Sequence, residues 1–389
     1  MDFRMATDND TTAVKELWAY SFESYEPYFS WYFSDIYKPE QTLCCFDDDI
    51  LAASLQLAEY RMMLRGQPVP VAYIVGVITA APYRFQGIAS RLLAFAFQEL
   101  RKRGIALAIL LPASPTVYGK NSFAYTYEEH RYDIDLKDLA SLAMPFGNWR
   151  MGGLDDMELI DQVYQKMTAA KNGYILRNQQ NWRNYLNEHL GDGGRIALLY
   201  DAQEQIAGYL LYTCKDDLFS INELGYASKE AQSSAFQFAL GHVNEAKRFY
   251  WAAPIDDCAY LSLASQEGIA ARPFIMARII DAVAALEAAS YPTHARGSMI
   301  VQILDKQIEE NNLTLMIKVA DQKLTAEVIE EPTPAHITMD ISALASLLWG
   351  RLSVKQLSEQ TDKLSGFDLP LEFLSTLFPP CASWMNEHS

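Results

Sequence analysis

The chain has little positive charge and no long hydrophobic run. Of its 389 residues, 32 are Lys or Arg and 49 are Asp or Glu, so the formal net charge is −17. A surface of this sign repels a phosphate backbone, and the sequence therefore predicts no binding to nucleic acid. The longest apolar stretches, Val69–Pro82 and Ile105–Ala113, are shorter than the roughly 20 residues that a membrane-spanning helix needs. We expect no membrane insertion, and the acidity favours solubility or a cationic partner.

The cysteines and histidines exclude further kinds of site. The five cysteines form no C-x-x-C pair, and no two of the six histidines stand in an H-x-x-x-H pair. The segment Met1–Arg4 lacks the basic and apolar regions of a secretory signal. These absences predict reduced thiols, a cytoplasmic location and no bound metal.

The pattern of apolar residues divides the chain into three regions, 1–147, 148–289 and 290–389. The first alternates helices and strands, which is typical of an α/β domain, and the second repeats this order. The third has strands followed by helices, which is typical of an α+β domain. In the first region we predict helices at Thr11–Phe22 and Ile88–Arg103 and strands at Leu43–Phe46, Ile50–Leu57, Val71–Thr79 and Ile105–Leu111.

One segment, between residues 75 and 93, carries most of the functional information. A buried strand leads through a short loop, Arg84-x-x-Gly87-x-Ala89, into a helix. Amides at a helix N-terminus beside an arginine can bind a pyrophosphate, and a glycine lets the backbone approach it. An ordinary strand–turn–helix, with Gly87 as a turn residue, explains the same pattern. The loop matches neither the P-loop nor the G-x-G-x-x-G pattern, which argues against a nucleotide triphosphatase or a dinucleotide-dependent oxidoreductase.

A second motif follows the next buried strand and reads ASPTVYGKNSF over Ala113–Phe123. Together the two motifs resemble those of GNAT acetyltransferases. They are most similar to the enhanced intracellular survival (Eis) family, in which a Tyr-Gly-(Lys or Arg)-x-x-Phe element follows an Ala-Ser pair. The order of the three regions also resembles that family, and Ile337–Gly350 resembles the sterol-carrier-protein pattern.

The resemblance implies an α/β fold of tandem GNAT domains, each a mixed sheet flanked by helices. An α+β sterol-carrier-protein-like domain with a C-terminal tail would follow. It implies an N-acetyltransferase that uses acetyl-CoA as co-substrate, without a metal, and forms a homo-oligomer, for which a hexamer is one candidate. Direct transfer to a primary amine of a cationic acceptor, aminoglycoside-like or polyamine-like, would be its reaction. The second GNAT domain has no arginine-to-glycine spacing at Gly225–Ala231, so we expect it to bind no coenzyme A.

The resemblance also implies catalytic roles. Tyr118 would be the general acid that protonates the departing thiolate, because a phenol is protonated at neutral pH. A packed aromatic residue at a helix start is the other interpretation of Tyr118. In the family the general base is the carboxylate at the C-terminus, and the last residue is aromatic. The corresponding candidate here is the terminal carboxylate of Ser389, which is not an aromatic residue. Because Trp384 is followed by five further residues, Glu387 or a water relay are alternatives.

The resemblance also implies, by position in the sequence, which residues bind the cofactor and which bind the acceptor. Most acceptor-site aromatics could equally be core residues, although aromatic walls with carboxylates suit a cationic amine. The residues expected to bind acetyl-CoA are Val77, Ile78, Thr79, Arg84, Phe85, Gln86, Gly87, Ile88, Ala89, Ser90 and Ser114, and those expected to bind the acceptor are Phe22, Glu26 and Trp31.

Two other functions remain open at this point. The acceptor could be a protein lysine instead of a small molecule, since pocket width depends on loops that the sequence does not define. Alternatively, the chain could be a non-enzymatic lipid or small-molecule binder that uses its C-terminal domain. The intact Arg84 loop and Tyr118 argue against the binder.

Overall fold

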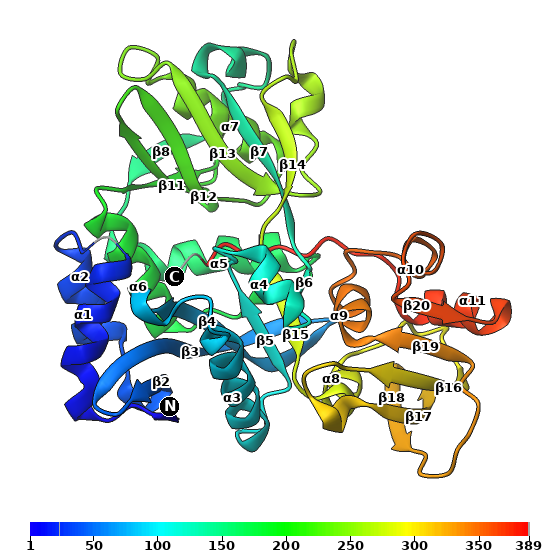
Figure 1. The fold of residues 1–389 in the computed structure, drawn as a ribbon. Coiled ribbons are helices and arrows are strands. Elements are labelled where there is room, and N and C mark those ends of the chain that lie inside the picture. Colours follow the sequence, from blue (N-terminus) through cyan, green and yellow to red (C-terminus); the bar gives the residue numbers. More distant parts are fainter. Residues whose placement is uncertain (23, 388–389) are drawn as a thin grey trace. The chain divides into compact units, whose positions relative to one another are not determined.

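The computed structural model describes residues 1–22 and 24–387 and divides them into two compact units (Figure 1). The first unit joins Met1–Tyr127 to Phe274–Cys381, and the second joins Glu128–Pro273 to Ala382–Glu387. Each unit therefore contains segments that are far apart in the sequence.

The first unit contains a mixed sheet with helices on both faces. Its strands run in the order β1-β2-β3-β4-β5-β15-β6, and only β4 and β5 pair in parallel. Along β2, Leu43 and Cys45 pack with helix α3, whereas Cys44 and Phe46 pack with helix α1, so the two helices cover opposite faces. The elements are β1 (Asp2–Met5), α1 (Thr11–Ser21), α2 (Tyr28–Trp31), β2 (Thr42–Asp47), β3 (Ile50–Leu64), β4 (Gln67–Thr79), α3 (Ile88–Lys102), β5 (Leu107–Leu110), α4 (Pro115–Lys120), β6 (Ala124–Tyr125) and β15 (Met276–Ile279).

The rest of the first unit is the C-terminal α+β domain. Its sheet has the order β18-β17-β16-β19-β20, and every residue of helix α9 is buried. The elements are α8 (Ala282–Ala288), β16 (Gly297–Leu304), β17 (Leu313–Ala320), β18 (Lys323–Val328), β19 (Ile337–Asp340), α9 (Ile341–Trp349), α10 (Val354–Gln360), β20 (Leu364–Gly366) and α11 (Asp368–Leu377).

Two buried contacts attach this C-terminal domain to the first sheet. Arg278 on β15 forms an ion pair of 2.7 Å with Asp305, and both side chains are fully buried. The Trp349 indole donates a hydrogen bond of 2.8 Å to the Tyr127 hydroxyl. The first sheet and the C-terminal domain therefore share one unit.

The sheet of the second unit repeats the strand arrangement of the first sheet. This sheet has the order β14-β7-β13-β12-β11-β10-β8, and β12 and β13 form its parallel pair. The elements are β7 (Glu128–Asp135), β8 (Asn148–Met151), α5 (Met157–Thr168), β9 (Tyr174–Ile175), α6 (Gln179–Gly191), β10 (Arg195–Tyr200), β11 (Ile206–Lys215), β12 (Leu218–Tyr226), α7 (Lys229–Leu240), β13 (Arg248–Pro254) and β14 (Ile269–Pro273).

The sheets do not follow the boundaries 147/148 and 289/290 that the sequence suggests. Strand β7 precedes residue 147 but pairs with β13 and β14 in the second sheet. Strand β15 precedes residue 289 but pairs with β5 and β6 in the first sheet. Apolar periodicity identifies a strand but carries no information on the strand that it pairs with.

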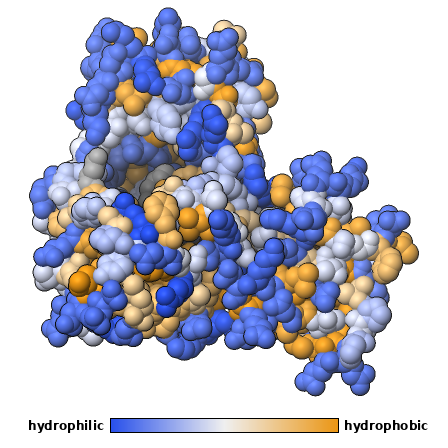
Figure 2. Space-filling view, in the orientation of Figure 1, coloured by the Kyte–Doolittle hydropathy of each residue, from blue (hydrophilic) through white to orange (hydrophobic). Residues whose placement is uncertain are grey.

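Hydrophilic residues are spread over much of the face that Figure 2 draws, as expected for a chain of charge −17. Within the described ranges 1–22 and 24–387, no helix has the length and apolar character needed to cross a lipid bilayer.

Candidate active site

The strand–loop–helix segment forms as the sequence predicts, with β4 ending at Thr79 and α3 beginning at Ile88. Gly87 precedes the helix with a φ of 74°, and a Cβ at this position would meet nothing within 4 Å. Glycine is thus favoured here by the positive φ, and the space beside it is open. The first helical bond runs from the Arg91 amide to the Gly87 carbonyl (3.1 Å). The amides that open α3 therefore precede the helical hydrogen bonds, as an anion site requires.

Two side chains of the loop before α3 donate hydrogen bonds to backbone carbonyls. Arg84 Nε donates to the Thr79 carbonyl (3.0 Å), and Gln86 Nε2 donates to the Pro82 carbonyl (3.0 Å). Phe85 has a φ of 62° and is fully exposed. Because Arg84 donates to the Thr79 carbonyl through Nε, its two terminal guanidinium nitrogens can donate hydrogen bonds to a ligand. This arginine beside open helix amides fits the diphosphate of coenzyme A.

Strand β4 separates from β5 after Tyr73, although β4 continues to Thr79. The two strands pair only at Ala72 with Ala108 and at Tyr73 with Ile109. Farther along β4, the two residues Gly76 and Val77 lie opposite the single β3 residue between Ser54 and Gln56. This extra residue on β4 makes a β-bulge. The second half of β4 therefore has a partner strand on one side only among the described residues, and its other side faces a pocket.

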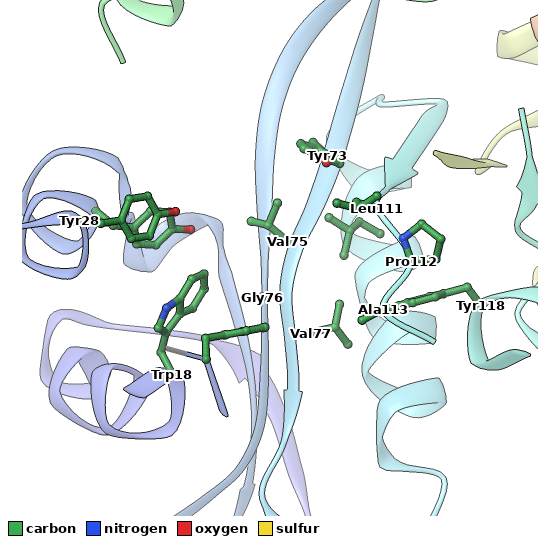
Figure 3. A pocket seen from close by; sticks show the side chains of 13 residues that line it. Trp18, Tyr28, Tyr73, Val75, Gly76, Val77, Leu111, Pro112, Ala113 and Tyr118 are labelled. Atoms are coloured by element: carbon green, nitrogen blue, oxygen red, sulfur yellow. The ribbon is translucent and has the colours of Figure 1, made fainter. Parts of the chain in front are cut away.

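This pocket has a volume of about 500 Å³ and is lined from both sides of β4. Figure 3 shows Trp18 and Tyr28 on one side of the strand and Ala113 and Tyr118 on the other. Most of its walls are apolar or aromatic. The lining residues are Trp18, Phe22, Tyr28, Tyr32, Tyr73, Ile74, Val75, Gly76, Val77, Leu111, Pro112, Ala113 and Tyr118.

Tyr118 extends from α4 into the wall of this pocket (Figure 3). Its ring packs edge-on against Phe123, with centroids 5.9 Å apart, and only 7% of the residue is exposed. Burial raises the pKa of the phenol above its ordinary value of 10. Tyr118 is thus a packed aromatic residue whose phenol is protonated at neutral pH and lies in the pocket wall.

The other predicted cofactor residues lie around the pocket and the loop. Val77 lines the pocket, whereas Ile78 pairs with Ser54 and is buried. Ser90 Oγ accepts a hydrogen bond of 3.1 Å from Asn121 Nδ2. Ser114 is the exposed N-cap of α4, one residue beyond the pocket wall.

The predicted acceptor residues are dispersed. Phe22 lines the pocket, but Glu26 and Trp31 are not among its lining residues. Glu26 accepts a hydrogen bond of 2.7 Å from the Ser30 hydroxyl on the surface, and Trp31 packs against Tyr28. Tyr28, from the aromatic segment expected to form the acceptor site, does line the pocket. Sequence reasoning missed Trp18, because apolar helical spacing looks the same in a core and in a pocket wall.

The C-terminal tail is anchored within the second unit. Glu387 is 5% exposed and accepts a hydrogen bond of 2.7 Å from Arg177, whose other nitrogens bind Glu223 in a bidentate pair. Trp384 packs against Tyr164, with ring centroids 5.7 Å apart. The Glu387 carboxylate is therefore engaged in a buried ion pair. Ser389, the predicted base, lies outside the described residues.

The second unit differs from the first at the corresponding helix start. Strand β12 ends at Tyr226 and α7 begins at Lys229, after Ser228. The Ser228 hydroxyl accepts a hydrogen bond of 3.2 Å from the Ala231 amide. One amide at this helix start is thus bonded to a side chain of its own chain, which distinguishes α7 from α3.

Comparisons with known proteins agree with this geometry. A model of the acetyltransferase (GNAT) domain matches residues 2–126, a second GNAT-domain model matches 173–279, and a sterol carrier protein domain matches 282–386. The chain belongs to the GNAT acetyltransferases, and its two GNAT domains are followed by a sterol carrier protein domain. This GNAT enzyme is an acetyltransferase, and domains of this family use acetyl-CoA as co-substrate.

Relatives and solved structures extend the similarity over the whole chain. An uncharacterized N-acetyltransferase from Streptomyces avermitilis is 23% identical over 349 residues, which cover 82% of this chain and 81% of the relative. In fold, the chain is similar to a GCN5-related N-acetyltransferase from Anabaena variabilis (TM-score 0.87, 21% identity, 99% of both chains). It is also similar to Eis1 from Mycobacterium abscessus (TM-score 0.78, 17% identity, 100% of both chains). The predicted fold class is thus confirmed.

The part of the chain that the structure describes holds no group of three or more His, Cys, Asp and Glu side chains able to bind a metal ion.

Proposed function

We propose that this GNAT enzyme transfers the acetyl group of acetyl-CoA directly to the primary amine of a cationic acceptor, with Tyr118 as general acid. One observation carries the proposal: a buried phenol whose pKa is raised lies in the wall of a pocket bounded by the unpaired side of β4. The loop and helix that would bind a diphosphate follow directly on that strand.

Different residues bind the cofactor, orient the thioester and transfer the proton. Arg84 and the amides that open α3 hold the diphosphate, and the backbone of residues 77–79 orients the thioester. The amine nitrogen forms the new C–N bond as the C–S bond breaks. The Tyr118 hydroxyl gives its proton to the sulfur, because a phenol is still protonated at neutral pH.

A general base must take the proton that the amine loses. We propose the C-terminal carboxylate of Ser389 for this role, in keeping with the Eis resemblance. The pairing of Glu387 with Arg177 at 2.7 Å supports this choice, since it engages the other carboxylate of the tail.

We also propose that the protein is cytoplasmic and forms a homo-oligomer, with a hexamer as the first state to test. The five cysteines are all free thiols, which supports a reducing compartment. The resemblance to the Eis family supports the oligomer.

The experiment is to incubate the protein with acetyl-CoA and a panel of amines and to detect acetylated products by mass spectrometry. The panel contains phenethylamine, spermidine, tobramycin and a lysine-containing peptide. Thiol release, corrected for protein alone because Cys258 is exposed, gives the rates. Acetyl-CoA binding without any acetylated amine would overturn the proposal.

A further inference from the structure

The walls of the pocket restrict the acceptor that it can hold. We infer that the acceptor carries a single amino group on an aromatic or apolar body and is not a polyamine or an aminoglycoside. The inference rests on the proposed acetyl transfer and narrows its substrate class.

Aromatic rings form the wall on the α1 and α2 side of β4. Trp18 stacks on Tyr32 with ring centroids 4.7 Å apart, and Phe22 lies 4.9 Å from Trp18. Tyr28 lies 5.9 Å from Tyr32 and completes this wall. The faces and edges of these rings favour an apolar or aromatic body, and they attract one ammonium group through cation–π contacts.

The opposite wall is apolar up to the proposed acid. Leu111, Pro112 and Ala113 follow β5, and Tyr118 stands beyond them on α4 (Figure 3). Val75 and Val77 of β4 lie between the two walls. Among the described lining residues, the polar side-chain groups are therefore tyrosine hydroxyls and the Trp18 indole N–H, with no charged side chain. The Tyr32 hydroxyl donates a hydrogen bond of 2.7 Å to Gln56.

No Asp or Glu is among the described residues that line the pocket. The chain has 49 such residues, so their absence here does not reflect a shortage of acids. Of the two acids in the segment expected to form this site, Glu26 is exposed and bonded to Ser30, and Glu23 lies outside the described residues. An aminoglycoside-like or polyamine-like acceptor calls for carboxylates, and none is among the described residues that line the pocket.

A polycation would meet an unfavourable environment in such a pocket. The reacting amine must be neutral to attack, so its own charge needs no carboxylate there. Each additional ammonium group, however, would lose water without gaining an acidic partner among the described lining residues, which is costly in an apolar site. A molecule with one amino group avoids this cost, and its apolar body gains by burial.

The first test compares kcat/KM for phenethylamine and spermidine, with tobramycin as a second polycation. We expect phenethylamine to exceed both by about tenfold or more, the discrimination typical of pocket contacts. Equal or higher values for either polycation would overturn the inference while leaving the proposed acetyl transfer intact. Acetylation of none of the amines would overturn both.

The second test introduces the missing charge at Phe22, which lines the pocket and is 43% exposed. Phe22→Glu should lower the ratio of kcat/KM for phenethylamine to that for spermidine by about tenfold, whereas Phe22→Leu should keep the preference for phenethylamine. Melting temperatures of both variants show whether the fold is retained. An unchanged ratio in a folded Phe22→Glu protein would mean that this pocket does not bind the acceptor body.

Discussion

Gly76 and Trp18 lie so close that only a residue without a side chain fits at position 76. A Cβ on Gly76 would be 2.5 Å from the Trp18 ring, and Gly76 has a φ of 60°. The glycine is part of the β4 bulge, and the tryptophan is part of the aromatic wall of the pocket. The bulge and the wall therefore depend on each other.

Replacing this glycine should damage the pocket and the stability of the first unit together. For Gly76→Ala we expect a loss of about 1 kcal/mol from the positive φ and a further 1–3 kcal/mol, roughly, from overpacking against Trp18. The KM for the acceptor should rise, because the indole must move. Urea unfolding and steady-state kinetics measure the two effects.

Gly104 provides the matched control. Its φ is 70°, but a Cβ there would meet nothing within 4 Å. Gly104→Ala should therefore cost only the backbone part, about 1 kcal/mol, with unchanged acceptor KM. Equal losses in the two variants would show that contact with Trp18 does not constrain position 76.

Removing the Tyr118 hydroxyl should slow the reaction without weakening the binding of acetyl-CoA. We expect Tyr118→Phe to reduce kcat by about 10²–10⁴-fold, the range for loss of a general acid, while the Kd for acetyl-CoA from calorimetry stays the same. Tyr125→Phe, on β6 and outside the pocket lining, is the control. A kcat within a factor of about two of the wild type would assign the acid elsewhere.

The pH profile gives a second view of Tyr118. Burial raises the pKa of its phenol above 10. The acid is active in its protonated form, so its deprotonation should lower kcat/KM only above pH 10, and the plateau should extend through neutral pH. A loss of kcat/KM between pH 7 and 9 that Tyr118→Phe abolishes would contradict the raised pKa.

Local features of the site could be predicted from the sequence, but its non-local partners could not. The start of α3 was predicted correctly because Gly87 and the apolar periodicity after it are local signals. The exclusion of Glu26 from the pocket was not predictable, because the pocket wall forms where α1, α2 and β4 come together, and the local sequence around Glu26 does not define this meeting. The positive φ of Gly76 is likewise set by its β3 partner and by Trp18, which lies far away in sequence.

Arg84 should contribute to cofactor binding and little to folding. Its side chain is exposed and is held through Nε by the Thr79 carbonyl. Arg84→Ala should raise the Kd for acetyl-CoA by about 10–100-fold, the value of hydrogen bonds to a charged group, and the effect should shrink at high salt. Arg61→Ala removes another exposed arginine that donates to a backbone carbonyl, that of Pro68. It should leave the Kd unchanged; similar losses in both variants would exclude a specific role for Arg84.

The buried pair of Arg177 and Glu223 should dominate the stability of the second unit. Burial acts to raise the pKa of Glu223, but the attraction and hydrogen bonds of Arg177 outweigh it and hold this pKa below its ordinary value of 4.5. The carboxylate therefore stabilises the fold fully above that ordinary value, and the contribution is lost as pH falls through the lower pKa of the folded state. Glu223→Gln leaves Arg177 with Glu387 alone and should cost about 3–5 kcal/mol at pH 7.

An exposed ion pair between arginine and glutamate tests whether burial causes the large expected loss of stability. Glu204 pairs with Arg150 on the surface of the same unit, where the two side chains are 62% and 52% exposed. Glu204→Gln should change the free energy of unfolding by less than about 1 kcal/mol. In Glu223→Gln, hydrogen exchange should also become faster at Trp384–Glu387, because Asn386 donates to Glu223 (2.9 Å) and Glu387 shares its arginine. Unfolding energies that agree between the two variants, with tail exchange unchanged, would mean that this network does not anchor the C-terminal tail.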